Sequence, residues 1–157
     1  MHPHAQLIER FYAAFARRDW AGMAACYHPE VHFSDEVFDL HGADAGAMWR
    51  MLVTSGRDLS VDASGIEADD RCGRAHWDAR YTFSATGRRV LNRIDARFEF
   101  RDALIVRHVD RFDFWAWARQ ALGLPGLLLG WSSFLKGKVR ARAAKSLEAF
   151  RRSLAAG

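Results

Sequence analysis

Four side chains near residue 110 have the types and spacing for acid–base chemistry. His108, Asp110, Phe112 and Phe114 lie two residues apart, and residues at that spacing share one face of a β-strand. Neighbours on such a face stand about 6–7 Å apart, so the imidazole and the carboxylate could act on one substrate. A histidine exchanges protons near neutral pH. The spacing therefore predicts an acid–base pair, and an internal layer of hydrogen-bonded polar groups explains it equally well.

The elements around this pair decide which face of the strand is covered. Helical spacing of apolar residues and short strand patterns come first in the chain, at Pro3–Arg18, Trp20–Tyr27, Val31–Ser34, Val37–Leu40 and Ala43–Thr54. Alternating patterns then predict a run of antiparallel strands at Leu59–Ala68, Cys72–Ser84, Arg89–Phe100 and Ala103–Trp115. Helices segregated from an antiparallel sheet are typical of an α+β fold in which the helices cover one face.

The composition limits the classes of protein that this chain can be. With 157 residues, half of them hydrophobic, it can form one full core. No apolar run reaches the 18 residues of a membrane span, and the N-terminus has no signal-peptide core. Cys26 and Cys72 are too few for a disulfide framework, so we expect reduced thiols in a cytoplasmic protein. No metal-binding, phosphate-binding or nucleophile-elbow motif is present, and we expect no metal.

The C-terminal segment is different in character. An apolar run, Leu127–Leu135, precedes a predicted amphipathic helix, Lys136–Leu154. From Arg119 to Arg152 there are eight Lys or Arg residues and one acid, Glu148. Our first interpretation is a lid over the sheet or an arm that joins two copies. Contact with an anionic membrane is a second possibility, and nucleic-acid binding is not expected because aromatic residues are sparse among the basic ones.

The order of these elements resembles the nuclear transport factor 2-like superfamily, in its SnoaL-like polyketide cyclase and ketosteroid isomerase branch. The segments that carry the resemblance are Phe11–Phe15, Arg18–Met23, Tyr27–Val31, Gly42, Tyr81–Phe83 and Ile105–Asp113. It covers about residues 3–118 and implies a cone-shaped antiparallel sheet covered by the N-terminal helices. The even-numbered face of the last strand would then be inside. We therefore expect a cone domain over residues 1–118 and a basic helical extension of the same domain over 119–157.

The resemblance also implies roles for three residues. Asp35 stands where the ketosteroid isomerases carry the carboxylate that removes a proton next to a carbonyl, although a turn residue that caps its own backbone is the simpler interpretation. His108 and Asp110 match the cavity-facing acid–base positions on the last strands of the cyclases. The oxyanion donors of the isomerases are missing, because Phe11 and Ala96 stand at their positions. Steroid isomerisation is therefore not expected.

The expected function is binding of a small, largely apolar carbonyl or hydroxyl compound. His108, Asp110 and Asp35 would act on it as an isomerase, cyclase or hydrolase without a cofactor, and we expect a homodimer. The alternative is a non-catalytic ligand-binding or dimeric interaction module. Ordinary core packing is an alternative role for the residues that we expect to line the pocket, which are Phe11, Tyr12, Phe15, Trp20, Tyr27, Trp49, Trp77, Tyr81, Asn92 and Phe112.

Overall fold

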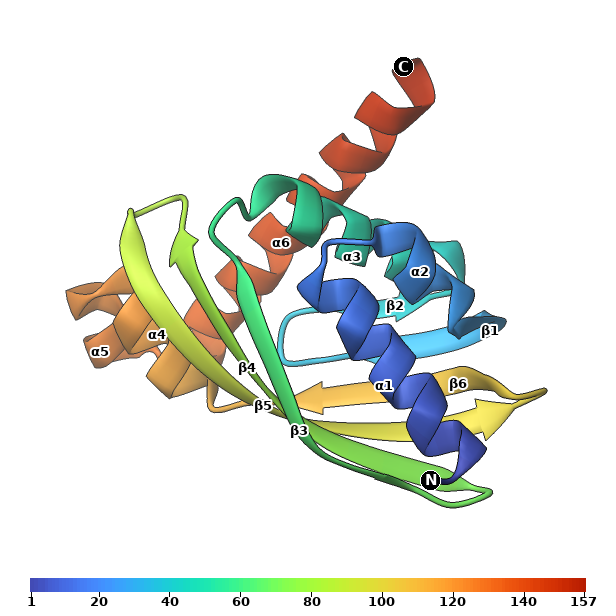
Figure 1. Ribbon diagram of the computed structural model, residues 1–157. Helices are drawn as coiled ribbons and strands as arrows, with labels where there is room; N and C mark the ends of the chain where they lie inside the picture. The colour runs from blue at the N-terminus through green and yellow to red at the C-terminus, as the bar shows by residue number, and fades with distance from the viewer.

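Six strands form one curved sheet with the order β2-β1-β6-β5-β4-β3 in the computed structural model, which describes residues 1–157 (Figure 1). The strands are β1 (Tyr27–Ser34), β2 (Asp39–His41), β3 (Ser60–Ala68), β4 (Cys72–Phe83), β5 (Arg88–Arg101) and β6 (Leu104–Arg111). Neighbouring strands are antiparallel, except that β1 and β6 run parallel. The predicted α+β fold with a curved antiparallel sheet is confirmed.

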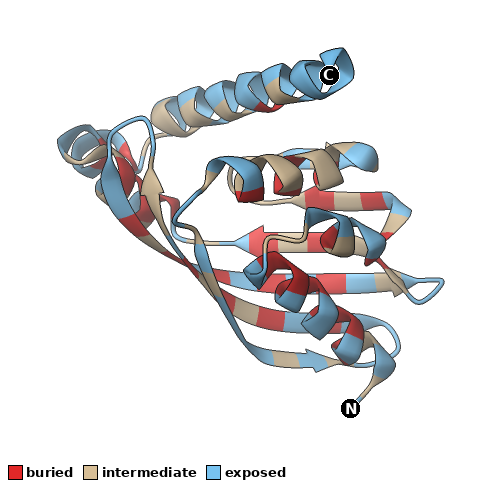
Figure 2. Cartoon of the chain, turned by 45° about the horizontal axis from the view of Figure 1, so that its top comes forward, coloured by how far each residue is buried: buried red, intermediate tan, exposed pale blue.

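Three helices cover the concave face of the sheet, namely α1 (Pro3–Ala16), α2 (Trp20–Ala25) and α3 (Ala43–Ser55) (Figures 1 and 2). Leu7, Ile8, Phe11 and Phe15 recur at three- and four-residue spacing, and all four are buried against the sheet. Asp19 caps α2 by accepting a hydrogen bond from the backbone N–H of Gly22 at 2.9 Å. The main hydrophobic core therefore lies between these helices and the strands.

The last strand is shorter than the alternating pattern predicted. It ends at Arg111, and Phe114 opens the helix α4 (Phe114–Leu122) instead of sharing a strand face with His108. The reason is local, because Asp113 accepts a hydrogen bond from the backbone N–H of Ala116 and caps the new helix. The alternating pattern continues beyond Asp113, where the cap starts a helix. The pattern alone therefore placed the end of the strand too late.

Strand β1 is longer than predicted and begins at Tyr27, although it contains Pro29. The pairing of β1 with β6 is irregular between Tyr27 and His32, and β2 pairs only with residues 32–34. Pro29 therefore lies where no regular ladder requires its missing N–H. This extension brings Tyr27 into the sheet rather than to the end of a helix.

Three C-terminal helices complete the fold, namely α4, α5 (Leu124–Leu129) and α6 (Ser133–Ala156). Where β6 stops, α4 lies beside the rest of β5, and the Gln120 side chain accepts a hydrogen bond from the backbone N–H of Leu91 at 2.8 Å. This bond gives a partner to a backbone N–H group on the edge of β5 that β6 does not cover. Gly123 ends α4, and α5 begins at the next residue, with Pro125 in its first turn, where the missing N–H has no cost.

Helix α6 runs back over α3 (Figure 1). Its Leu147 is buried in the main core, and Arg151 pairs with Asp44 of α3 at 3.0 Å. At its other end, Leu135 and Val139 pack against a small second cluster built on Val90 and Trp117. The start of α6 therefore lies near the end of β4 and the start of β5, and most of the helix surface stays exposed (Figure 2).

Candidate functional site

His108 lies at the centre of the concave face and is 0% exposed. Both ring nitrogens have partners: Nδ1 lies 2.7 Å from the Tyr27 hydroxyl and Nε2 lies 2.9 Å from Asp110 Oδ1. The predicted pair of imidazole and carboxylate therefore shares one face, and its two members contact each other directly.

The hydrogen bonds around His108 have one consistent direction. Trp49 Nε1 donates to the Tyr27 oxygen at 2.8 Å, so the Tyr27 hydrogen can donate to His108 Nδ1. This assigns the ring hydrogen to Nε2, which donates to Asp110. Trp77 Nε1 also reaches Asp110 Oδ1, at 3.4 Å. The four groups from Trp49 to Asp110 therefore form one directed chain that orients the imidazole.

Aromatic rings surround the imidazole beside its hydrogen-bond partners. The parallel pairing of β1 with β6 places Phe33 beside His108, with ring centroids 5.0 Å apart. Phe98, Phe11 and Trp49 have centroids 4.4, 5.5 and 6.0 Å from the imidazole. His108 is therefore held in an aromatic box. Phe33 and Phe98 were not predicted as its neighbours, because only the register of the strands brings them there.

Two buried polar atoms beside this box have no hydrogen-bond partner, namely Asp110 Oδ2 and the Tyr12 hydroxyl. Burial raises the pKa of Tyr12 well above its usual value, and the negative charge of Asp110 raises it further. The two side chains are thus within electrostatic reach of each other. An unpaired buried polar group costs about 1–3 kcal/mol, so this part of the interior is locally unfavourable for stability.

Asp35 follows β1 directly and forms the turn into β2. Its Oδ1 accepts hydrogen bonds from the backbone N–H groups of Val37 at 2.7 Å and Phe38 at 2.6 Å. The predicted turn-capping role is thus confirmed. The other oxygen, Oδ2, has no partner in the protein, so one side of the carboxylate holds the turn and the other side is available.

The surroundings of Asp35 make its carboxyl group a stronger base than an ordinary aspartate. Burial raises its pKa to about 6; the hydrogen bonds from Phe38 and Val37 oppose this rise, and the charge of Asp110 adds to it. At neutral pH most Asp35 carboxylates remain ionised. The group can therefore accept a proton near physiological pH, which is the property that a general base requires.

Asp35→Asn should increase stability at neutral pH. The pKa is about 6 in the folded state against 3.8 for the ordinary group, so the folded state binds this proton more tightly. Tighter proton binding stabilises the folded state fully when the pH is below 3.8, and this stabilisation is lost as the pH rises through about 6. Asn keeps the acceptor for both turn amides and carries no charge. We expect a gain of about 1–2 kcal/mol at about pH 7.5, after allowance for partial exposure, and almost none at about pH 4.

Urea denaturation at both pH values measures this difference, and Asp69→Asn is the matched control. Asp69 Oδ1 caps a turn in the same way, through the backbone N–H groups of Arg71 and Cys72 at 2.8 Å each. Asp69 is exposed, however, and its hydrogen bonds lower its pKa. The control should show no gain at neutral pH. A loss of stability in Asp35→Asn at about pH 7.5 would contradict the burial that we assign to this carboxyl group.

Most of the predicted lining residues do lie inside the cone. Tyr81 and Phe112 are half-buried and contact both clusters of apolar side chains. Trp20 is an exception, because the residue is 38% exposed and its ring lies under the guanidinium of Arg50, 4.0 Å away. Trp20 therefore lies at the surface and not among the interior side chains where we expected it. The lining residues that are buried in the main core are Phe11, Tyr12, Phe15, Tyr27, Trp49 and Trp77.

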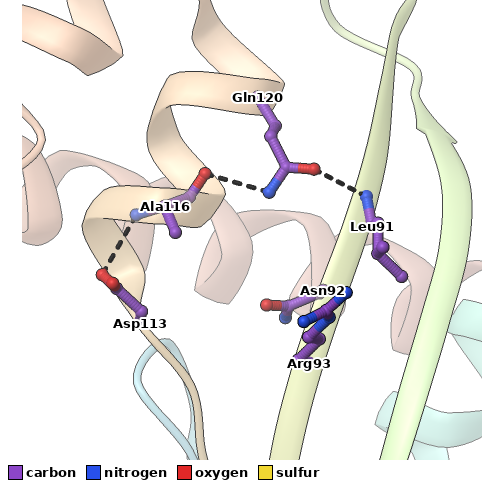
Figure 3. A pocket seen from close by; sticks show the side chains of 6 residues that line it. All are labelled: Leu91, Asn92, Arg93, Asp113, Ala116 and Gln120. Carbon is purple, nitrogen blue, oxygen red and sulfur yellow. Dashed lines mark hydrogen bonds between the residues drawn. The ribbon is translucent and has the colours of Figure 1, made fainter.

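Two surface depressions are found away from the pair. One of about 320 Å³ lies between α4 and β5 (Figure 3) and is lined by Leu91, Asn92, Arg93, Asp113, Ala116 and Gln120. Another of about 310 Å³ lies beside α1 and α2. Asn92 thus lines a different space from His108, and neither depression includes Asp35, His108 or Asp110. His108 itself is fully buried among aromatic side chains.

One group of possible metal ligands lies outside this interior. His32, Asp39 and His41 on β1 and β2 offer ligand atoms within 4.8 Å of one another. The guanidinium of Arg107 contacts the His32 ring, and a bound cation there would be repelled by it. The sequence did not suggest this group, since the register of β1 with β2 creates it.

Solved structures with the same fold are similar to most of this chain. An NTF2-like protein of unknown function from Burkholderia pseudomallei superposes with a TM-score of 0.62 and 20% identity, over 72% of this chain and 92% of that chain. A candidate polyketide cyclase from Xanthomonas campestris gives 0.63 and 21%, over 75% and 96%. An LEH-like epoxide hydrolase from M. tuberculosis gives 0.62 and 18%, over 81% and 96%. At these identities the similarity shows the fold.

The family follows from a direct match of the sequence. A search of curated protein sequences finds no match to this chain. A model of the SnoaL-like domain, however, matches residues 8–108, which include most of α1, all of α2 and α3, and the strands as far as His108. The curved sheet, the covering helices and this match agree with the resemblance seen in the sequence. The chain belongs to the SnoaL-like domain family.

Proposed function

We propose that this protein binds a small, largely apolar carbonyl compound at the open end of the cone and catalyses a proton transfer without a cofactor, with Asp35 as the general base. The observation that carries the proposal is the state of the Asp35 carboxyl group. One oxygen is held by two backbone amides, the other is free, and burial raises the pKa to about 6. A carboxylate that is both oriented and partly desolvated is suited to remove a proton next to a carbonyl.

A donor for the substrate oxygen is available close to this base. Trp117 Nε1 donates to the Tyr81 hydroxyl oxygen at 2.7 Å, which leaves the Tyr81 hydrogen without an acceptor in the protein. Burial and the charge of Asp35 both raise the pKa of Tyr81, so the two groups are within electrostatic reach. We propose that Tyr81 stabilises the developing enolate oxygen while Asp35 holds the abstracted proton.

His108 and Asp110 have a supporting role in this proposal. His108 is enclosed and uses both ring nitrogens, so it orients Asp110 rather than contacting the substrate. The charge of Asp110 raises the pKa of Asp35. The pair therefore adjusts the strength of the base from inside the cone.

Access to Asp35 would involve the first turn of α6. Lys136 of α6 pairs with Glu36, the residue after Asp35, while Leu135 and Val139 pack near Tyr81 and Phe112. We propose that this contact opens to admit the ligand. The candidate polyketide cyclase and the epoxide hydrolase with this fold are consistent with a small-molecule substrate, although they do not identify one.

A panel of small apolar ketones tests the proposal. Compounds that raise the melting temperature are selected first, since a ligand at 100 times its Kd adds about 2.7 kcal/mol. Exchange of the proton next to the carbonyl is then followed by NMR in deuterated buffer. Turnover should fall about tenfold per pH unit below about pH 6, because protonation of Asp35 removes the base. A rate that does not change between about pH 5 and pH 8 would overturn the assignment of Asp35.

The second candidate function is ligand binding or protein interaction without catalysis. The observation that favours it is the closed aromatic box around His108, which leaves the imidazole no free nitrogen. In that case compounds of the panel would stabilise the protein and none would be turned over. Asp35→Asn would then leave the affinity for these compounds unchanged.

A further inference from the structure

An exposed apolar surface lies at the end of the molecule formed by α5 and the start of α6. Six side chains belong to it, and each is between 45% and 74% exposed. Single exposed apolar residues are normal, but a contiguous group of large ones marks a binding surface. We call this group the apolar patch, and its members are Leu124, Leu127, Leu128, Leu129, Trp131 and Phe134.

The apolar patch continues directly into a row of free cations. Lys138, Arg142 and Lys145 follow Phe134 at helical spacing along one side of α6. All three are exposed, and none forms an ion pair, in contrast to Lys136, which pairs with Glu36. We call these three residues the basic row. Positive charges grouped without acidic partners repel one another, so an anionic surface would stabilise them.

Cations and apolar groups also contact each other at the junction. Lys138 Nζ lies 4.9 Å from the centre of the Phe134 ring. On the other side of the patch, the Arg119 guanidinium lies 4.4 Å from the Trp115 ring, which is itself 40% exposed. Aromatic side chains flanked by Lys and Arg have an apolar body for the acyl region and charges for the phosphates. The arrangement is that of a surface which lies at a lipid–water interface.

The charge distinguishes between a membrane and a second copy of this chain. A two-fold dimer through the apolar patch brings the same surface of both copies together, so it offers the basic row of each copy no acidic partner. Like charges across an interface cost several kcal/mol. A surface rich in anionic lipid headgroups has the opposite charge, so it complements the basic row while the apolar patch enters its outer layer.

We propose that the apolar patch and the basic row bind this protein to the surface of an anionic lipid bilayer. The Leu, Trp and Phe side chains enter the boundary between headgroups and acyl chains, and Lys138, Arg142 and Lys145 contact the phosphates. No helix of the protein combines the length and the apolar character required to cross a bilayer. The contact is therefore peripheral, and it weakens as salt screens the charges.

Co-sedimentation with vesicles tests this proposal on the full chain. Vesicles of phosphatidylcholine and phosphatidylserine in equal parts are compared with vesicles of phosphatidylcholine alone, at low and high salt. Wild-type protein should sediment with the anionic vesicles at low salt and be released at high salt. The triple variant K138Q/R142Q/K145Q should bind about 100-fold more weakly, since each cation near such a surface contributes about fivefold. The variant L128S/W131S/F134S should fail to sediment with the anionic vesicles even at low salt.

A matched variant distinguishes binding through the basic row from the general attraction of a basic protein to anionic vesicles. R89Q/R93Q/R97Q removes the same number of charges from exposed positions on β5 and should bind like wild type. All exchanged positions are exposed, and circular dichroism checks that the variants fold. Absence of binding to anionic vesicles at low salt would overturn the proposal, as would equal losses in both charge variants.

A partner other than a membrane would give a different result in these experiments. A dimer in analytical ultracentrifugation that L128S/W131S/F134S dissociates, without vesicle binding, would identify the patch as an interface between copies. Binding to a mixed-sequence oligonucleotide but not to vesicles would point to nucleic acid. Either result replaces the membrane as the partner.

Discussion

Asp35→Asn should lower the turnover of any substrate identified by the compound panel by roughly 10²–10⁴-fold, which is the usual contribution of a general base. The amide keeps an oxygen that accepts the two hydrogen bonds from Val37 and Phe38, so the turn between β1 and β2 should retain its shape. Substrate binding should change only a few fold, because the variant removes the proton acceptor and not the apolar contacts. The effect should therefore appear in kcat and leave KM nearly unchanged.

Asp69→Asn provides the matched control for this experiment. It makes the same replacement in a turn with the same pair of backbone hydrogen bonds, at an exposed position after β3. Its turnover should equal that of wild type. If both variants are equally active, Asp35 is only a turn residue and the proposed mechanism is wrong. Tyr81→Phe should lower kcat as well, since it removes the donor to the substrate oxygen.

His108→Ala should lower the free energy of unfolding by roughly 3–5 kcal/mol. The imidazole is completely buried among aromatic rings, so its removal leaves a cavity. It also leaves the Tyr27 hydroxyl and the Asp110 carboxylate without their shared partner. An unpaired charge in the interior is the larger part of this cost. Urea denaturation, with the slope compared between variants, measures the change.

His76→Ala is the comparison for His108→Ala, because His76 is also held by two polar partners. Its ring nitrogens contact Asp95 and Asp78 at 2.9 Å each, but on the partly exposed outer face of the sheet. Surface pairs of this kind contribute about 0–1 kcal/mol. A loss below about 1 kcal/mol in His108→Ala would show that the interior opens around the imidazole. That result would return His108 to the list of candidate substrate contacts.

The buried polar groups that lack a partner or have a raised pKa are concentrated in one region of this protein. The unpaired Tyr12 hydroxyl and Asp110 Oδ2, together with the raised pKa of Asp35, each reduce stability. Perturbed titratable groups gather at functional sites more often than elsewhere. Such local instability is expected where function rather than stability has determined the residue.

Periodicity along the chain was sufficient to predict the elements and the faces that they bury. The spacing of Leu7, Ile8, Phe11 and Phe15 marked the buried stripe of α1. Alternate residues of β5, namely Ile94, Ala96 and Phe98, are buried, as the period of two requires of a strand with one covered face. These predictions succeed because the repeat of a helix or a strand is a property of the local backbone. The same local pattern misplaced the end of β6, where the Asp113 cap interrupts it.

The sequence by itself determined the family, the curved α+β fold and the face on which His108 and Asp110 stand. The tertiary structure decided what these residues can do. Parallel pairing of β1 with β6 brings Tyr27 and Phe33 to His108, from positions some 75 to 81 residues away in the chain. Contacts between distant segments depend on register and packing, which no local repeat encodes. The same packing leaves Asp35 as the partly open carboxylate and encloses the pair that the spacing had suggested.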